Sequence, residues 1–289
     1  MVNFTEQEFE LEHLTLTARV WGHGRRHKVL ALHGWLDNCA SFNWLAPALD
    51  AHVVALDMAG HGLSGHRNHM APYNIWEDVV EIFAVADQLG WEEFTLLGHS
   101  RGAMVAMVAA GTWARRVTHL IMLDGIWPES TPDEYAPKQL SRSVRQTLSP
   151  SRKRATVYES WEKAIVARMN SAWPIVRTSS EALAERGLIA VDGGFIWRAD
   201  PKLQLPSAVK LTKAQIHAFM HEVTARCLLI LADEGITSKF EDLLQGVHHF
   251  PKIEVMNLPG SHHFHMEGQA DGVAALANPF IELGPLVVE

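Results

Sequence analysis

The residues best suited to chemistry in this chain are Gly98-His99-Ser100-Arg101-Gly102. A serine hydroxyl acts as a nucleophile when a base removes its proton, and two glycines at this spacing let the backbone turn sharply around it. A short, apolar, β-prone segment at residues 94–97 precedes the serine, and an apolar, helix-compatible segment at 103–110 follows it. The pattern predicts a serine nucleophile on a tight turn between a strand and a helix.

A serine nucleophile needs two partners. Histidine can take up and return a proton near neutral pH, and a carboxylate fixes the tautomer of that histidine. The chain offers many candidates for the base, because it contains 17 histidines. A histidine and an acidic residue from other parts of the chain must therefore meet Ser100.

The elements that could bring these groups together alternate regularly over the first 125 residues. The pattern predicts half-buried antiparallel strands within 9–21, buried strands at 29–32, 52–56, 94–97 and 117–123, and helices near 42–49 and 72–89. Such alternation indicates a parallel sheet with helices on both faces. His33, Asp57, Ser100 and Asp124 each follow one of the strands, so we expect them at the same edge of the sheet.

The alternation stops between residues 126 and 211, a segment with several prolines and with amphipathic stretches near 158–169 and 179–186. We interpret this segment as an inserted helical cap, or lid. Further strands are predicted at 227–232 and 253–256, and a closing helix should begin near Gln269 or Asp271. Residues 1–125 and 212–289 would then form one core domain.

The composition of the chain indicates which binding partners and which cellular location to expect. The 289 residues carry a formal charge of −8, which disfavours nucleic acid or an anionic membrane as the main partner. Cys39 and Cys227 are expected to be buried free thiols. No secretory signal is visible at the N-terminus and no apolar run reaches the length of a membrane span, so we expect a cytoplasmic protein.

Four motifs together resemble the α/β-hydrolase family over nearly the whole chain. They are His33-Gly34, the loop Asp57…Gly60-His61-Gly62…Ser64, the turn around Ser100, and a late Gly-x-His-x-x-x-x-Glu. Within that family, Trp197-Arg198-x-Asp200-Pro201-x-Leu203 and the histidine-rich end look most like the serine hydrolase-like subgroup. The resemblance implies a mostly parallel eight-stranded sheet with helices on both faces, an inserted helical cap, and a serine hydrolase.

The resemblance also implies roles for single residues. Ser100 would be the nucleophile, and His262, five residues before Glu267, would be the base. His263 and His265 are alternatives that fit the spacing less well, and packing or supporting hydrogen bonds would explain them.

The acid departs from the usual pattern of the family. Most relatives carry it after the strand that here ends at Ala232, but in that register Gly235 stands where the aspartate belongs. Asp124 follows the strand next to that of Ser100 in the expected sheet order, and some relatives place their acid there. We predict Asp124 as the acid, with Asp233 or Glu234 as the alternatives.

By the same analogy, the backbone N–H groups of Trp35 and Arg101 would stabilise the oxyanion. Two histidine groups could suggest a metal site: His262, His263 and His265, or His61, His66 and His69. A base at His262 explains the first group better, so we expect no metal catalysis. No dinucleotide or phosphate-binding glycine pattern is present, so we expect no cofactor.

The function expected from these features is cleavage of a small to medium carboxylic ester through an acyl-enzyme on Ser100. Carbon–carbon bond hydrolysis, thioester cleavage and perhydrolysis would use the same residues, and a weakly catalytic ligand receptor is the alternative of another class. Aromatic residues of the predicted cap suggest a substrate with an apolar or aromatic group. They are Trp127, Tyr135, Trp161, Trp173, Phe195 and Trp197.

Overall fold

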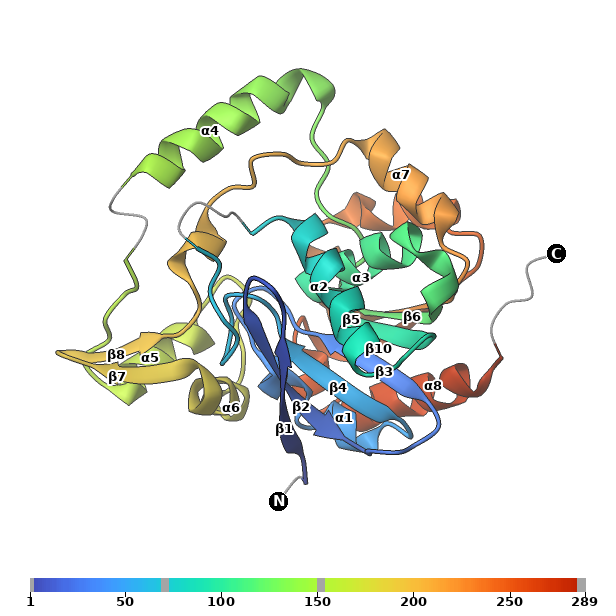
Figure 1. The fold of residues 1–289 in the computed structure, drawn as a ribbon, viewed down its shortest axis with the longest axis horizontal. Coiled ribbons are helices and arrows are strands. Elements are labelled where there is room, and N and C mark those ends of the chain that lie inside the picture. The colour runs from blue at the N-terminus through green and yellow to red at the C-terminus, as the bar shows by residue number, and fades with distance from the viewer. Residues whose placement is uncertain (1–2, 69–72, 150–153, 285–289) are drawn as a thin grey trace.

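The structure is a computed structural model that describes residues 3–68, 73–149 and 154–284 (Figure 1). Its centre is an eight-stranded sheet in the order β1-β2-β4-β3-β5-β6-β9-β10. The pairs β1–β2 and β2–β4 are antiparallel, and the other neighbours are parallel. The strands are β1 Thr5–Glu10, β2 Thr15–Trp21, β3 Lys28–Leu32, β4 His52–Asp57, β5 Phe94–His99, β6 Val117–Leu123, β9 Arg226–Glu234 and β10 Ile253–Ser261.

Helices cover both faces of this sheet, as the alternating pattern predicted. Residues of α2, α3 and α7 pack in one hydrophobic cluster, and residues of α1 and α8 pack in a second. Alternate residues of β3 divide between the two, since Leu30 belongs to the first cluster and Val29 and Ala31 to the second. The helices are α1 Leu45–Ala48, α2 Ile75–Gln88, α3 Arg101–Thr112, α7 Lys213–Glu222 and α8 Ala270–Glu282.

The differences from the predicted elements in this part are small. The helix expected at 42–49 is divided into a 3-10 turn, η1, at Cys39–Phe42 and the short α1. The helix expected from Pro72 begins at Ile75, and Pro72 itself lies outside the described residues. Cys39 and Cys227 are buried free thiols, as predicted. Further 3-10 turns are η2 Ala114–Arg116, η3 Asp133–Tyr135, η5 Pro201–Gln204, η6 Ile236–Ser238, η7 Glu241–His249 and η8 Phe264–Met266.

The segment from residue 126 to 211 is not purely helical. It contains α4 Ala136–Leu148, α5 Trp161–Met169 and α6 Arg177–Gly187, and also a two-stranded hairpin of β7 Leu188–Val191 and β8 Gly194–Trp197. Asp192-Gly193 forms the turn, and Gly193 has a φ of 83°, which is typical of the tight hairpin turns that this dipeptide favours. The sequence therefore did carry a signal for the hairpin. Figure 1 shows these elements, in green to yellow, on one side of the sheet.

This segment has a small apolar core of its own. Ala164, Ile165, Ala184 and Leu188 form it. Trp161, Phe195 and Trp197 pack against this cluster, so three of the aromatic residues that suggested an apolar substrate pack within the segment. Tyr135 is half exposed, at 50%.

Among the described residues, no helix has both the length and the apolar character needed to cross a membrane.

Candidate active site

Ser100 lies at the turn between β5 and α3, with a φ of 52° and a ψ of −116°. Gly98 and Gly102 allow the backbone segments on either side of Ser100 to approach each other closely. A Cβ on Gly98 would lie 2.4 Å from the backbone nitrogen of Ala103, and one on Gly102 would lie 2.1 Å from the carbonyl oxygen of Leu32. Both distances are too short for any side chain, so the tight strand-to-helix turn requires glycine at both positions.

Three predicted residues meet at this turn. The imidazole Nε2 of His262 is 2.9 Å from the hydroxyl oxygen of Ser100, and its Nδ1 is 2.6 Å from Oδ2 of Asp124. Because a carboxylate only accepts, Nδ1–H donates to Asp124, and Nε2 is left to accept from the Ser100 hydroxyl. The structure thus brings together the serine, histidine and aspartate on which the sequence analysis settled.

Backbone groups and a glycine hold Asp124 in place. Its carboxylate accepts hydrogen bonds from the N–H of Ala232, at 3.1 Å, and of Ile236, at 2.8 Å. A Cβ on Gly235 would lie only 2.3 Å from the oxygens of this carboxylate. Glycine at position 235 therefore leaves space for the aspartate that comes from the neighbouring strand.

The alternative acids do not occupy this position. Asp233 and Glu234 end β9 with exposed side chains, while Asp124 is fully buried. Asp124 also has a φ of 43°, a left-handed conformation that aspartate tolerates better than most residues. Of the three candidates, Asp124 is the one whose carboxylate contacts His262.

The imidazole of His262 is buried among aromatic and charged groups. Trp173 stacks on it, with ring centroids 4.1 Å apart and planes 27° apart, and the ammonium of Lys239 lies 3.7 Å from the Trp173 ring centroid. Burial lowers the pKa of His262 from its usual 6.5, although the hydrogen bond to Asp124 acts in the opposite direction. A lowered pKa favours the neutral imidazole, which is the form that can accept the proton of Ser100.

Ser100 and His262 line a cavity of about 500 Å³. Trp35 and Arg101, the residues predicted to supply oxyanion donors, line the same cavity. Arg101 is the first residue of α3, where backbone N–H groups have no partner within the helix. The guanidinium of Arg101 forms an ion pair with the carboxylate of Asp78, at 2.5 Å.

The other described histidines of the two suspected groups each make contacts of their own. His61 is buried against the ring of His33, His66 contacts the carbonyl oxygen of Arg198, and His69 lies outside the described residues. His265 is buried against His99, with ring centroids 4.2 Å apart, and burial lowers the pKa of His265 to about 3. In the part of the chain that the structure describes, His262, His263 and His265 do not together form a set of metal ligands.

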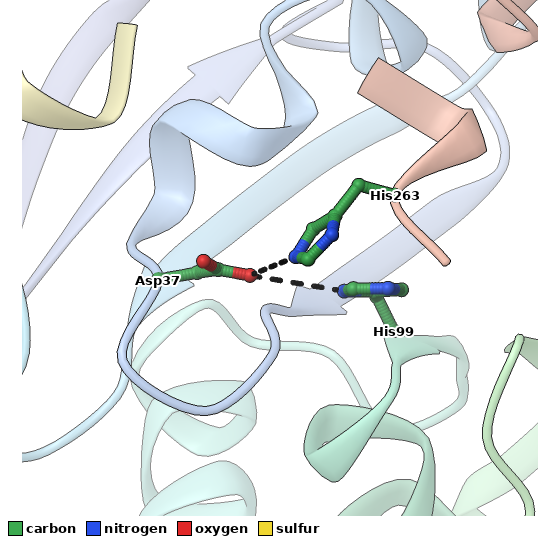
Figure 2. Close-up of side chains that lie close together, drawn as sticks. All are labelled: Asp37, His99 and His263. Atoms are coloured by element: carbon green, nitrogen blue, oxygen red, sulfur yellow. Dashed lines mark ion pairs between the residues drawn. The ribbon is translucent and has the colours of Figure 1, made fainter. Parts of the chain in front are cut away.

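One buried cluster was not foreseen. Asp37, from the loop after β3, directs one carboxylate oxygen toward both His99 and His263 (Figure 2). Arg168 of α5 binds the other oxygen of this carboxylate. Burial would raise the pKa of Asp37, but Arg168 and His263 hold it well below the usual value. No local motif marks Asp37, because its partners come from distant parts of the chain.

Comparison with known proteins identifies the family. Residues 29–276 match the alpha/beta hydrolase family. The chain belongs to that family. A serine hydrolase-like protein of Mus musculus is 30% identical over 92% of each chain, and one of Danio rerio is 29% identical over 92% of this chain and 85% of the relative. The predicted family and subgroup are confirmed.

Solved structures place the hydrolase in the same fold. A hypothetical protein of Pseudomonas aeruginosa PAO1 is 40% identical, has a TM-score of 0.92, and aligns over 96% of this hydrolase and 99% of its own chain. The thioesterase domain from the curacin biosynthetic pathway has a TM-score of 0.84 at 23% identity, a likeness in fold alone. The chain is thus a serine hydrolase-like member of the family, and family membership indicates a small-molecule substrate.

Proposed function

We propose that this hydrolase cleaves carboxylic esters through an acyl-enzyme on Ser100. The observation that carries the proposal is the continuous hydrogen-bonded chain from the Ser100 hydroxyl through His262 to Asp124. A serine hydroxyl is too weak an acid to react unaided, and this chain supplies both the base and the carboxylate that orients the base.

The reaction would proceed in two halves. The Ser100 oxygen attacks the ester carbonyl carbon while Nε2 of His262 takes the hydroxyl proton. That proton then passes to the leaving alcohol as the carbon–oxygen bond breaks. Water attacks the acyl-enzyme with His262 again as base, the acid departs, and the proton returns to Ser100.

The N–H groups of Trp35 and Arg101 are our candidates for stabilising the tetrahedral oxyanion. Both residues border the cavity beside Ser100, and Arg101 opens a helix whose N-terminal dipole favours negative charge. Loss of one such donor typically costs roughly 100- to 1000-fold in rate.

We further propose that residues 126–211 form a cap over a core of residues 1–125 and 212–289. The cap would supply much of the cavity wall, including Trp173, Val209 and Leu211. Together with Trp76 and Met104 of the core, these side chains favour a substrate with an apolar or aromatic group. The cytoplasmic location stays a prediction from the sequence.

A fluorophosphonate probe tests whether Ser100 is activated. We expect the folded hydrolase to be labelled, and peptide mapping by mass spectrometry to place the label on Ser100. Protein unfolded in denaturant is the control and should not react. If the folded protein resists the probe, a ligand receptor with an inactive serine would be the better description.

The pH dependence of kcat/KM follows from the pKa of His262. The base must be neutral to accept the serine proton, so activity should rise with pH through this pKa and then level off. Because burial lowers the pKa, the midpoint of the acid limb should lie below 6.5. Initial rates with a p-nitrophenyl ester, corrected for p-nitrophenol ionisation, check this. A midpoint above 6.5 would contradict it.

A further inference from the structure

The cluster of Asp37, His99 and His263 lies directly beside the proposed active site. Oδ2 of Asp37 is 3.9 Å from Nδ1 of His99 and 3.4 Å from Nε2 of His263, as the dashed lines in Figure 2 show. All three residues are buried, and all three line the cavity of Ser100. In the described part of the chain, no other set of three such side chains has its ligand atoms this close together.

A hydrogen bond determines which nitrogen of His99 is free. Nε2 of His99 lies 2.9 Å from the carbonyl oxygen of His262. A carbonyl only accepts, so Nε2 carries the hydrogen and Nδ1 presents a lone pair. This lone pair and Oδ2 of Asp37 face each other at 3.9 Å, and among the described residues neither atom has a partner with full hydrogen-bond geometry, the nearest group to Oδ2 being Nε2 of His263 at 3.4 Å.

Two buried acceptors that face each other are unfavourable unless something positive or a donor lies between them. An imidazole whose other nitrogen donates to a backbone carbonyl is the usual arrangement of a histidine metal ligand. We propose that Asp37, His99 and His263 bind a divalent cation of the Zn²⁺ class through Oδ2, Nδ1 and Nε2.

The distances fit this kind of ion. Tetrahedral zinc with bonds of about 2.0–2.1 Å separates its ligand atoms by about 3.3 Å. The pair Asp37–His263 already has this spacing, and His99 must approach Asp37 by about half an ångström. The fourth position would face the cavity that the three residues line.

The positive charge of Arg168 opposes a bound cation. Its guanidinium binds Oδ1 of Asp37 at 2.5 Å, so Oδ2 stays available, and it lies 3.5 Å from Nε2 of His263. A cation entering the cluster would meet this positive charge at close range. Arg168 should therefore weaken metal binding, and its removal should strengthen it.

A bound ion would also affect the neighbouring base. His263 follows His262 directly, and the His99 ring is hydrogen-bonded to the His262 carbonyl. Drawing His99 and His263 toward one ion would shift His262 relative to Ser100. This expectation rests on the proposed function: Zn²⁺ should slow the labelling of Ser100 by the fluorophosphonate probe.

Cobalt(II) spectroscopy tests binding independently of activity. Co²⁺ added to the full-length protein, without a polyhistidine tag, should give the visible absorption bands of a tetrahedral site, and Zn²⁺ should abolish them. Asp37→Asn and His263→Gln should each weaken Co²⁺ binding by at least about 10-fold. Circular dichroism would verify that both variants fold.

The matched control is a histidine cluster away from the cavity, where His217 of α7 stacks on His249, with ring centroids 3.5 Å apart. A His217→Gln/His249→Gln double variant should keep the bands. Bands that disappear in this control, or no bands in the wild type, would overturn the proposal.

Arg168→Met provides the second arm of the test. If the cluster binds a cation, this variant should bind Co²⁺ more tightly than the wild type, because a nearby positive charge is gone. Equal or weaker binding in a folded Arg168→Met protein would count against the site. If Zn²⁺ leaves the rate of labelling unchanged while Co²⁺ binds, the metal site stands and its influence on His262 is refuted.

Discussion

The Ser100→Ala variant is expected to lose at least about 1000-fold in kcat toward p-nitrophenyl esters of short acids. The alanine removes the only atom that could form the acyl-enzyme and leaves the rest of the cavity unchanged. Because Ser100 has a φ of 52°, a non-glycine residue is already accommodated at the turn, and alanine should not disturb folding. Initial rates and circular dichroism check both parts of this expectation.

Ser207→Ala is the matched control, since Ser207 lines the same cavity but no described hydrogen bond joins its side chain to His262. This variant should retain most of its activity. If Ser100→Ala keeps wild-type turnover, the acyl-enzyme mechanism is wrong, and water attack or another nucleophile would have to explain hydrolysis.

The Asp124→Asn variant should lower kcat by roughly 1000- to 10,000-fold. An asparagine amide cannot provide the negative charge that stabilises the imidazolium, and it favours the wrong tautomer of His262. The backbone should tolerate the change, because asparagine also adopts the left-handed conformation found here at a φ of 43°. Steady-state kinetics with the same ester measure the effect.

Asp233→Asn provides the comparison, because Asp233 was an alternative acid and its side chain is exposed. Its kcat should stay within about 2-fold of the wild type, as for an ordinary surface substitution. The reverse outcome, a crippled Asp233→Asn and an active Asp124→Asn, would mean that the acid comes from β9.

The segment of residues 126–211 contributes directly to the environment of the proposed base. Trp173 stacks on the His262 imidazole, and Arg168 binds Asp37 beside His263. Both residues come from or follow α5, so movement of this helix would alter the packing around His262. Residues of this segment therefore line the cavity and also contact the proposed metal cluster.

Much of the fold was predictable because its signals are local. The apolar runs of β3, β5 and β6 and the helical spacing of α2 each reflect burial of a short segment. The hairpin of β7 and β8 was missed because only four residues form each strand, and its Asp192-Gly193 turn lies within a segment read as helical.

The sequence by itself determined the turn around Ser100, because glycines at 98 and 102 are a local steric requirement. Tertiary structure decided which acid reaches the base. His262 is 162 positions from Ser100 and 138 from Asp124, and Gly235 clears the space between strands that the Asp124 carboxylate fills. Tertiary structure also decided that Asp37, His99 and His263 lie together. Contacts between groups so distant along the chain depend on sheet order and loop packing, which residue spacing alone does not specify.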